Sequence, residues 1–296
     1  MMSEETQFRC KNSDCTRLFP VINGVPVLLN ESNSIFSIGD FICGKSTTFD
    51  LMKPKWKKNL HKLLPKISLN VKAKNNVLLV KRLLLNKSSH PRVLVVGGSI
   101  EGEGMSMLGA DIETVSTDVS FGPLTELICD AHDLPFINQS FEGVVIQAVL
   151  EHVVDPYRCV EEVHRVLKSD GIVYAETPFM QQVHMGRYDF TRFTHLGHRR
   201  LFRKFFEIES GASCGTGMAL ISAIRGFLQS LTSRRLVQRC LRVMVSVTLF
   251  WLKYLDYLTI DKPATNDAAS GLYFIGGKAQ NTLSDRELLN EYKGAQ

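Results

Sequence analysis

The sequence predicts an α/β fold built around a doubly wound, mostly parallel sheet. Between residues 91 and 211, segments with strand character alternate with segments of helical periodicity, which is typical of β-α-β units. The run RVLVV at 92–96 is continuously apolar, as in a strand buried on both faces. A glycine-rich turn, GGSIEGEGMSML at 97–108, follows directly. Glycines at this point favour a backbone that turns tightly and approaches a ligand.

Length and composition exclude several protein classes. The 296 residues are 44% hydrophobic and 22% charged, so the chain can bury a full core and is neither disordered nor a disulfide-stapled miniprotein. Seven cysteines form no dense framework, and the N-terminus lacks an apolar signal segment. We therefore expect a reducing, cytoplasmic setting. The apolar run VMVSVTLFWL at 243–252 is shorter than the roughly 20 residues of a membrane span.

The chain divides into four expected parts. In order, they are a small hairpin unit at 1–31, a basic and partly helical connector at 32–90, a sheet domain at 91–280 with a helical insertion or cap at 217–268, and a polar tail at 281–296. Within the first unit, Asn23-Gly24 lies between two apolar runs, the pattern of a type I′ hairpin. The connector contains a predicted helix at 75–85.

Further strands follow the first at regular intervals. They are predicted at 112–118, 127–130, 143–147, 171–177, 205–210 and 271–278. A helix is predicted at 156–168, because its apolar residues fall on one face. Asp155 supplies its N-cap, Pro156 its first position, and Gly171 follows its end.

The glycine-rich turn and the next strand suggest a nucleotide-like ligand. We expect the turn to open a helix whose free N–H groups face that ligand. Asp118 ends the second strand, 21 residues after Gly97, where an acid can accept hydrogen bonds from ribose hydroxyls. This spacing predicts a cofactor that contains adenosine, although a tight turn without a ligand remains an alternative.

The stretch 129–178 resembles the class I S-adenosylmethionine-dependent methyltransferases of the type 11 group. Its matching elements are DAHDLPF at 130–136, LEHV at 150–153 and EVHRVLK at 162–168. The resemblance implies a Rossmann-like sheet of seven strands with an antiparallel last strand, which 271–278 would supply. It also implies S-adenosylmethionine as the cofactor.

The resemblance assigns roles around the cofactor. It implicates Gly97, Gly98, Ser99, Gly102, Asp118, Asp130, Ala131, His132 and Gln147. The glycine loop would hold the methionine and ribose parts, Asp118 the ribose hydroxyls, and Asp130 the adenine amino group, while Gln147 lies near the reactive methyl. Val95 stands where the family has an acid, which puts contacts to the methionine amine in doubt. A nicotinamide dehydrogenase is disfavoured, since the chain has no Tyr-x-x-x-Lys pair.

The acceptor is expected to meet the segment after the fifth strand, at 177–202. Methyl transfer needs alignment, and a hydroxyl or amine acceptor also needs a base. The candidates are His195 or His184 as the base, Asp189 as an orienting carboxylate, and Arg187, Tyr188 and Arg192 as substrate-binding residues. His198 and Arg199 are interpreted as structural or surface residues. The segment also resembles methyltransferases linked to bacterial surface-polysaccharide biosynthesis, which implies a small-molecule, glycan or lipid-linked sugar acceptor.

The helices predicted at 217–260 combine apolar residues with arginines. These are Arg225, Arg234, Arg235, Arg239 and Arg242. We expect a cap over the substrate pocket, because helix amphipathicity usually reflects packing. The alternative is an interfacial helix on anionic lipid, which would place the protein peripherally at the inner face of the membrane.

The net charge of +5 is concentrated in one segment. Residues 45–92 hold thirteen Lys or Arg and one acid, leaving 22 basic and 29 acidic residues elsewhere. A nucleic-acid methyltransferase or binding protein is an alternative, but Phe49 and Trp56 are the segment's only aromatic residues, too few for base stacking. A non-catalytic cofactor-binding scaffold is another alternative. The sequence carries no signal of oligomeric state.

The N-terminal unit resembles the distal half of a zinc-ribbon-like (Trm112-like) module. Cys10 and Cys15 are the cysteines that remain there. Because tetrahedral zinc requires four ligands, we expect this segment to be degenerate and to bind no metal.

Overall fold

Residues 7–10, 17–45, 47 and 64–296 are described by the computed structural model of the chain. Within them, seven strands form a central sheet in the order β6-β5-β4-β7-β8-β10-β9. β10 is antiparallel to both of its neighbours, and the pairs among the first five strands are parallel. The predicted seven-stranded sheet with an antiparallel last strand is therefore confirmed. The strands are β4 (Arg92–Val96), β5 (Glu113–Asp118), β6 (Leu127–Ile128), β7 (Phe141–Gln147), β8 (Leu167–Pro178), β9 (Phe205–Cys214) and β10 (Gly271–Lys278).

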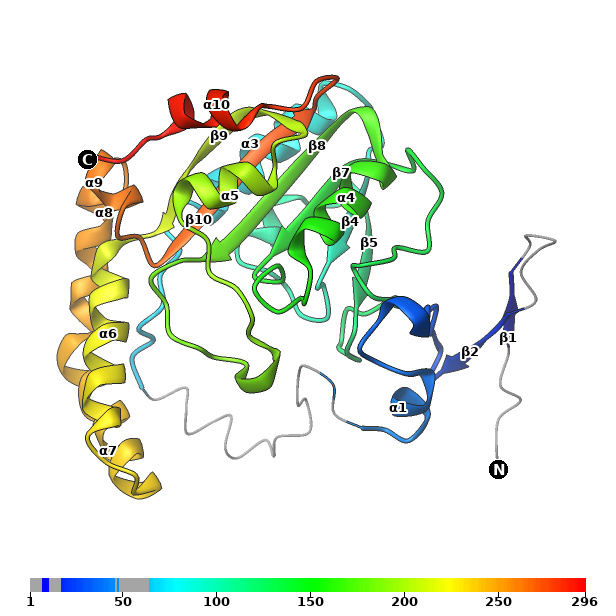
Figure 1. The fold of residues 1–296 in the computed structure, drawn as a ribbon. Helices are drawn as coiled ribbons and strands as arrows, with labels where there is room; N and C mark the ends of the chain where they lie inside the picture. Colours follow the sequence, from blue (N-terminus) through cyan, green and yellow to red (C-terminus); the bar gives the residue numbers. More distant parts are fainter. Residues whose placement is uncertain (1–6, 11–16, 46, 48–63) are drawn as a thin grey trace.

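Helices cover both faces of this sheet (Figure 1). On one face, α4 (Pro156–Val166) and α5 (His195–Leu201) bury Val163 and Leu201 in the larger core cluster. On the other, α3 (Ala73–Leu85) buries Val77 and Leu84 against strand residues. The helix predicted at 75–85 was assigned to the connector. Its packing makes it part of the sheet body, which consequently begins before residue 91.

The connection from β4 to β5 differs from the prediction. Residues 97–112, all of them described, contain the 3-10 helix η2 (Met105–Met107) and no α-helix. Gly97, Gly104 and Gly109 adopt φ values of +75°, +82° and +68°, a region that L side chains rarely occupy. Because glycine is among the poorest helix formers, this loop cannot present a helix N-terminus to the ligand.

The N-terminal unit forms a small antiparallel sheet at the edge of the molecule. Asn23 and Gly24 have φ values of +53° and +79°, as a type I′ turn requires, so the predicted hairpin is confirmed. Past the hairpin, Val27 forms a parallel bridge with Ile128 at the edge of the central sheet. Cys15 lies outside the described residues. The elements are β1 (Gln7–Arg9), β2 (Leu18–Ile22), β3 (Val25–Pro26), η1 (Glu31–Asn33) and α1 (Ile38–Ile42).

A helical hairpin stands between β9 and β10 and projects from the sheet body (Figure 1). None of the helices in the described part of the chain has the length and apolar character that crossing a membrane requires. The polar tail packs its last helices against α5. The remaining elements are η3 (Gly186–Tyr188), α6 (Thr216–Ser230), α7 (Arg235–Leu249), η4 (Phe250–Leu255), α8 (Asp256–Thr259), α9 (Pro263–Asn266), α10 (Asp285–Leu288) and η5 (Leu289–Glu291).

Acidic residues of the chain neutralise several charges of the basic segment. Phe49 and Trp56, on which the stacking argument depended, lie outside the described residues. The described ion pairs are Lys45–Asp40 (2.9 Å), Lys72–Asp261 (2.5 Å), Lys81–Asp111 (3.0 Å) and Arg92–Glu113 (3.0 Å). These four basic residues are thus less available to a phosphate backbone than the sequence suggested.

Candidate active site

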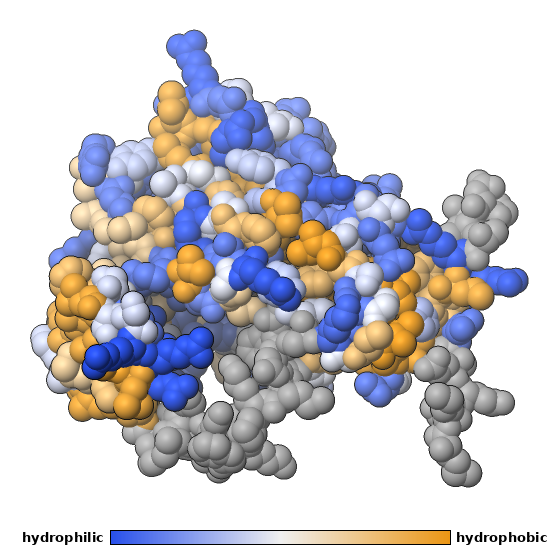
Figure 2. Space-filling view, turned by 60° about the horizontal axis from the view of Figure 1, so that its bottom comes forward, coloured by the Kyte–Doolittle hydropathy of each residue, from blue (hydrophilic) through white to orange (hydrophobic). Residues whose placement is uncertain are grey.

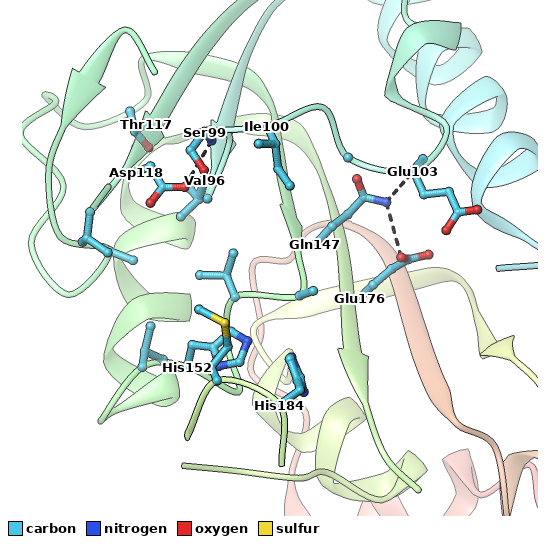
Figure 3. A pocket seen from close by; sticks show the side chains of 18 of the residues that line it. Val96, Ser99, Ile100, Glu103, Thr117, Asp118, Gln147, His152, Glu176 and His184 are labelled. Carbon is cyan, nitrogen blue, oxygen red and sulfur yellow. Dashed lines mark hydrogen bonds between the residues drawn. The ribbon is translucent and has the colours of Figure 1, made fainter. Parts of the chain in front are cut away.

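One cavity of about 510 Å³ lies at the carboxyl ends of the central strands (Figure 3). In a doubly wound sheet this edge is where ligands bind. Eight of the nine predicted cofactor residues line it: Gly97, Ser99, Gly102, Asp118, Asp130, Ala131, His132 and Gln147. Gly98 is the exception, since it is not among the lining residues. A Cβ at Gly98 would meet Val95 Cγ1 at 3.0 Å and Ser116 Cβ at 3.1 Å. Its missing side chain therefore relieves packing against neighbouring strands.

Asp118 holds the glycine loop at one end of the cavity. Its Oδ2 accepts a hydrogen bond of 3.1 Å from the backbone N–H of Ser99 (Figure 3). Burial raises the pKa of Asp118, although hydrogen bonds from Ser99 oppose that shift. A carboxylate in this position can accept hydrogen bonds from vicinal hydroxyls.

Asp130 forms a second polar point of the cavity. Its Oδ1 accepts from the backbone N–H of His132 at 3.0 Å and lies 2.6 Å from that residue's Nδ1. Its Oδ2 accepts from Ser34 Oγ at 2.5 Å. Burial alone would raise the pKa of Asp130, but these hydrogen bonds outweigh it and hold the pKa below its usual range. Ser34 belongs to the segment after the N-terminal hairpin, and so does Phe36, which lines the cavity. The sequence predicted a role in the site for neither residue.

Glu176, at the end of β8, also lines the cavity and was missed. Its carboxylate accepts from Asn70 Nδ2 at 3.0 and 2.9 Å and from Tyr174 Oη at 2.6 Å. It also accepts from Gln147 Nε2 at 3.3 Å (Figure 3). Burial raises the pKa of Glu176. A signal existed, since Glu176 is the last acid of the fifth predicted strand, one residue before its end, much as Asp118 ends the second.

His152 and His184 meet at another end of the cavity (Figure 3). Their ring centroids are 4.7 Å apart, with the planes inclined by 78°. Burial lowers the pKa of both imidazoles. Next to them, Glu151 is 1% exposed, and burial raises its pKa to about 8. Within the described residues, neither of its carboxylate oxygens has a hydrogen-bond partner.

Asp189 and Arg192 fold the loop that carries His184. Arg192 donates from both terminal nitrogens to the Asp189 carboxylate and from Nε to the carbonyl oxygen of Gln181 at 3.0 Å. Asp189 also accepts from the backbone N–H of His184 at 2.9 Å. Burial opposes ionisation of Asp189, but Arg192 and His184 outweigh it and lower the pKa to about 2. The Asp189 carboxylate is thus placed beside His184, where the sequence put an orienting group.

The structure separates other predicted residues from the cavity. Among its described lining residues His195 is absent, and His195 Nε2 instead lies 3.4 Å from Ser210 Oγ on β9. This placement does not suit the base predicted at His195. Arg187, Tyr188 and Arg192 are likewise absent from that lining. Arg187 stacks on the Tyr188 ring at 4.8 Å, and both line a second hollow of about 460 Å³ that shares Phe36 with the lining of the cavity.

His198 and Arg199 have structural environments, as the sequence interpretation held. The His198 ring packs on Phe202 with centroids 5.2 Å apart. Arg199 Nη1 donates to the carbonyl oxygen of Phe202 at 3.0 Å. Both side chains are buried, so neither belongs to the surface.

A comparison with protein families decides the class of reaction. Residues 99–175 match the family model described as a methyltransferase domain, and this range contains the glycine loop from Ser99 onward, Asp118, Asp130 and Gln147. The chain is an S-adenosylmethionine-dependent methyltransferase. The cavity fits the cofactor, since its lining includes the carboxylates of Asp118 and Asp130, which can accept hydrogen bonds from ribose hydroxyls and from an amino group.

The methyltransferase is similar to several solved structures. One is a methyltransferase in complex with the Haloferax volcanii Trm112 activator, at 18% identity and a TM-score of 0.41, covering 71% of this chain and 92% of that one. Another is phosphoethanolamine N-methyltransferase 2 of Haemonchus contortus with S-adenosylmethionine, at 16% identity and a TM-score of 0.42, covering 70% of this chain and 53% of that one. A third is a sarcosine dimethylglycine methyltransferase from Galdieria sulphuraria, at 10% identity and a TM-score of 0.45, covering 76% of this chain and 97% of that one. No curated protein matches the chain.

Proposed function

We propose that this methyltransferase methylates a hydroxyl oxygen of a glycan or lipid-linked sugar acceptor at a membrane surface. The observation that carries the proposal is the set of residues that line the part of the cavity beyond Asp118 and Asp130, the two acids assigned to adenosine. There it is lined by Glu176, Gln181, His152 and His184, and by Met218 near the start of the projecting hairpin. Polar groups of this kind can orient a hydroxylated acceptor, and the hairpin lies beside it.

The adenosine end would hold the cofactor through groups already described. Asp118 would accept from the ribose hydroxyls and Asp130 from the adenine amino group, with Ala131 beside the ring. When bound, S-adenosylmethionine supplies an electrophilic methyl group on a sulfonium. The Gln147 amide is held by the Glu103 carbonyl at 3.2 Å and by Glu176 at 3.3 Å, and it would fix the boundary between the cofactor and the acceptor.

Glu176 is the proton acceptor that we propose. It would remove the proton of the attacking hydroxyl as the oxygen forms its bond to the methyl carbon and the bond from that carbon to sulfur breaks. Hydrogen bonds from Tyr174 and Asn70 would fix its orientation, and its raised pKa makes it a stronger base than an ordinary carboxylate. His184, the base suggested by the sequence, lies instead in the group around Glu151.

The helical hairpin of α6 and α7 supports a membrane location. Val245 and Ser246 of α7 are buried, but large apolar side chains elsewhere in the hairpin are exposed. They include Leu220, Phe227, Leu231, Leu236, Val243, Met244 and Val247, and the helices η4 and α8 that follow expose Trp251 and Leu258 as well. Figure 2 shows apolar surface next to hydrophilic side chains on the left of the molecule. Apolar residues and arginines together suit an interface with anionic lipid.

The sequence favoured a cap over the pocket for these helices. Met218 does line the cavity, but Phe227, Leu231 and Leu236 are 65%, 67% and 72% exposed. A cap that served packing alone would bury such residues. The arrangement therefore supports a hairpin whose base borders the cavity and whose far part faces lipid.

Vesicle flotation tests the membrane part of the proposal. The wild-type protein should float with vesicles of phosphatidylglycerol and phosphatidylcholine, and less with phosphatidylcholine alone. A Phe227→Ser, Leu236→Ser double variant should remain in the soluble fraction. Ile137→Ser is the matched control, since Ile137 is an 83% exposed apolar residue in a loop of the sheet body. Equal flotation of the wild type and the double variant would remove the membrane proposal.

Transfer of labelled methyl groups tests the acceptor. Cell extract incubated with the enzyme and labelled S-adenosylmethionine should yield label in the fraction extracted by organic solvent, as an ether stable to mild base. Glu176→Gln should lower the rate by about 100-fold, within the range expected for loss of a general base. Label in RNA would instead favour the nucleic-acid alternative. Absence of S-adenosylhomocysteine binding in calorimetry would contradict the enzyme assignment itself.

A further inference from the structure

Three potential metal ligands converge at the acceptor end of the cavity. Glu151 Oε1 lies 3.5 Å from His152 Nε2 and 3.9 Å from His184 Nε2. One ligand atom from each of these residues lies within 4.8 Å of the other two. Two atoms bound to one ion at about 2.1 Å, with a tetrahedral angle between them, are about 3.4 Å apart. The two separations from Glu151 Oε1 are close to this value, and a rearrangement of the three side chains that also draws the two imidazoles together would bring all three atoms within bonding distance.

The other nitrogen of each imidazole is already engaged. His152 Nδ1 is 2.7 Å from the carbonyl oxygen of Tyr188. Because a carbonyl only accepts, Nδ1 carries the proton and Nε2 keeps its lone pair. His184 Nδ1 lies 3.4 Å from Asp189 Oδ2, an acceptor that favours the proton on Nδ1 and the lone pair on Nε2, the nitrogen that lies 3.9 Å from Glu151 Oε1. Arg192 Nη2 is 3.5 Å from the same Nδ1, but a guanidinium only donates, so this contact does not orient a protonated Nδ1. Outer groups orient metal-binding histidines in this way.

The Glu151 carboxylate is buried beside the two imidazoles without a hydrogen bond to either. It is 1% exposed, and both of its oxygens lack a hydrogen bond among the residues that the structure describes. Arg192, the nearby cation, is committed to Asp189 and to loop carbonyls. Buried charges are normally paired or coordinate a metal, so a cation between Glu151 and the two imidazoles would satisfy an otherwise isolated group.

We propose that Glu151, His152 and His184 bind one divalent transition-metal ion beside the acceptor. Two imidazoles and one carboxylate suit Mn²⁺, Fe²⁺, Co²⁺ or Zn²⁺, whereas Mg²⁺ and Ca²⁺ prefer oxygen ligands. Three protein ligands leave coordination positions open. His152 and His184 line the cavity, so those positions face the space that we assign to the acceptor.

The role of the ion depends on the proposed function, although its binding does not. An acceptor hydroxyl would occupy an open position and be held at a fixed place. Adjacent hydroxyls of a sugar would chelate the ion, which favours an acceptor with vicinal oxygens. With both Nε2 atoms coordinated, Glu176 remains the base on the other side of the cavity. This inference departs from the sequence, which predicted no metal.

Titration of the full-length protein with Mn²⁺ alone tests the site. After dialysis against a chelator, the loss of the free-ion signal in electron paramagnetic resonance should report one bound Mn²⁺ per chain. Thiols prefer softer ions, so Mn²⁺ avoids adventitious binding to cysteine. Co²⁺ should then give visible absorption bands of a site with nitrogen and oxygen ligands.

Glu151→Gln keeps the shape of the side chain and removes the charge, and it should weaken Mn²⁺ binding at least tenfold. His184→Gln should weaken it likewise, whereas His195→Gln should not, since that imidazole lies outside the cavity. Circular dichroism and S-adenosylhomocysteine affinity serve as checks on folding. The proposal fails if the wild type takes up no Mn²⁺ or Co²⁺, or if a folded Glu151→Gln variant binds Mn²⁺ as tightly. Failure to find a glycan acceptor would leave this binding result unaffected.

Discussion

Asn70 Nδ2 donates to both carboxylate oxygens of Glu176, over 3.0 and 2.9 Å. The same side chain accepts through Oδ1 from the backbone N–H of Ala73 at 2.9 Å, at the start of α3. One amide therefore joins the first turn of a helix to the carboxylate at the end of β8. The two residues are 106 positions apart, and their contact fixes a wall of the active site.

Asn70→Ala should impair both folding stability and catalysis. Hydrogen bonds to a charged group contribute about 1.5–3 kcal/mol, so the free energy of unfolding in urea should fall by about that amount. The methylation rate should fall because Glu176 loses its orienting donor, while S-adenosylhomocysteine affinity should change little. Asn86→Ala, an exposed position at the other end of α3, is the control. An Asn70→Ala enzyme with a normal rate would contradict the role assigned to Glu176.

Asp130 should select adenine over hypoxanthine. Because a carboxylate accepts from the exocyclic amino group of adenine, wild-type protein should bind S-adenosylhomocysteine at least tenfold more tightly than its inosine analogue. Asp130→Asn should reduce that preference, since an amide can also donate to a keto oxygen. Calorimetry with both ligands measures the ratio. An exposed Asp170→Asn variant should keep it, and an unchanged ratio in Asp130→Asn would place the adenine elsewhere.

His198 should make the protein sensitive to acid. Burial lowers its pKa to about 3, so below the ordinary histidine pKa of about 6.5 the unfolded state binds a proton that the folded state does not. Above pH 6.5 neither state binds this proton, so His198 does not make the folding stability depend on pH there. Between the two pKa values, stability falls by about 1.4 kcal/mol per unit of decreasing pH.

His198→Phe removes this proton and suits the surrounding aromatic rings. Urea unfolding at pH 7, 5 and 4 should therefore show a shallower loss of stability in this variant than in the wild type. An exposed His90→Phe variant should follow the wild-type curve. Parallel curves for His198→Phe and the wild type would show that this imidazole is protonated in the folded state.

Asp256 should stabilise the base of the helical hairpin. Its carboxylate, which is fully buried, accepts from the backbone N–H groups of Gly217 at 2.7 Å and Met218 at 3.1 Å. It therefore caps the N-terminus of α6 from the far side of the hairpin. Asp256→Ala leaves these donors unsatisfied and should cost about 1–3 kcal/mol.

Hydrogen exchange should reveal the Asp256→Ala effect as faster exchange in α6 than in the central strands. Asp261→Ala is the matched control, since Asp261 is 76% exposed and pairs with Lys72 on the surface, where such pairs contribute about 0–1 kcal/mol. Equal protection of α6 in both variants would show that the cap is unimportant.

Much of the fold was predictable because it depends on local patterns. The apolar run of β4 matches its predicted bounds, and Asn23-Gly24 forms the expected turn. The acids that end strands also lie where parallel strands bring them together. In contrast, the helix predicted after β4 is absent, since the glycines of that loop outweigh its position in a β-α-β pattern.

The contacts that complete the cavity were not predictable from periodicity. Ser34 meets Asp130 across 96 positions, and His184 meets Glu151 through a loop folded by Asp189 and Arg192. Such long-range contacts depend on how loops pack against the sheet, and local patterns in a single sequence do not predict them. His195 illustrates the reverse case, since a reactive residue type in a promising segment is not among the described residues that line the cavity.

The position of Ser34 and Phe36 has a consequence for modularity. The segment that follows the hairpin supplies both a hydrogen bond to Asp130 and part of the cavity wall. A shortened protein that began at the sheet would consequently keep its core but lose one side of its nucleotide pocket. The N-terminal appendage and the catalytic body cannot be exchanged between relatives as independent units, and changes in one would have to be matched by changes in the other.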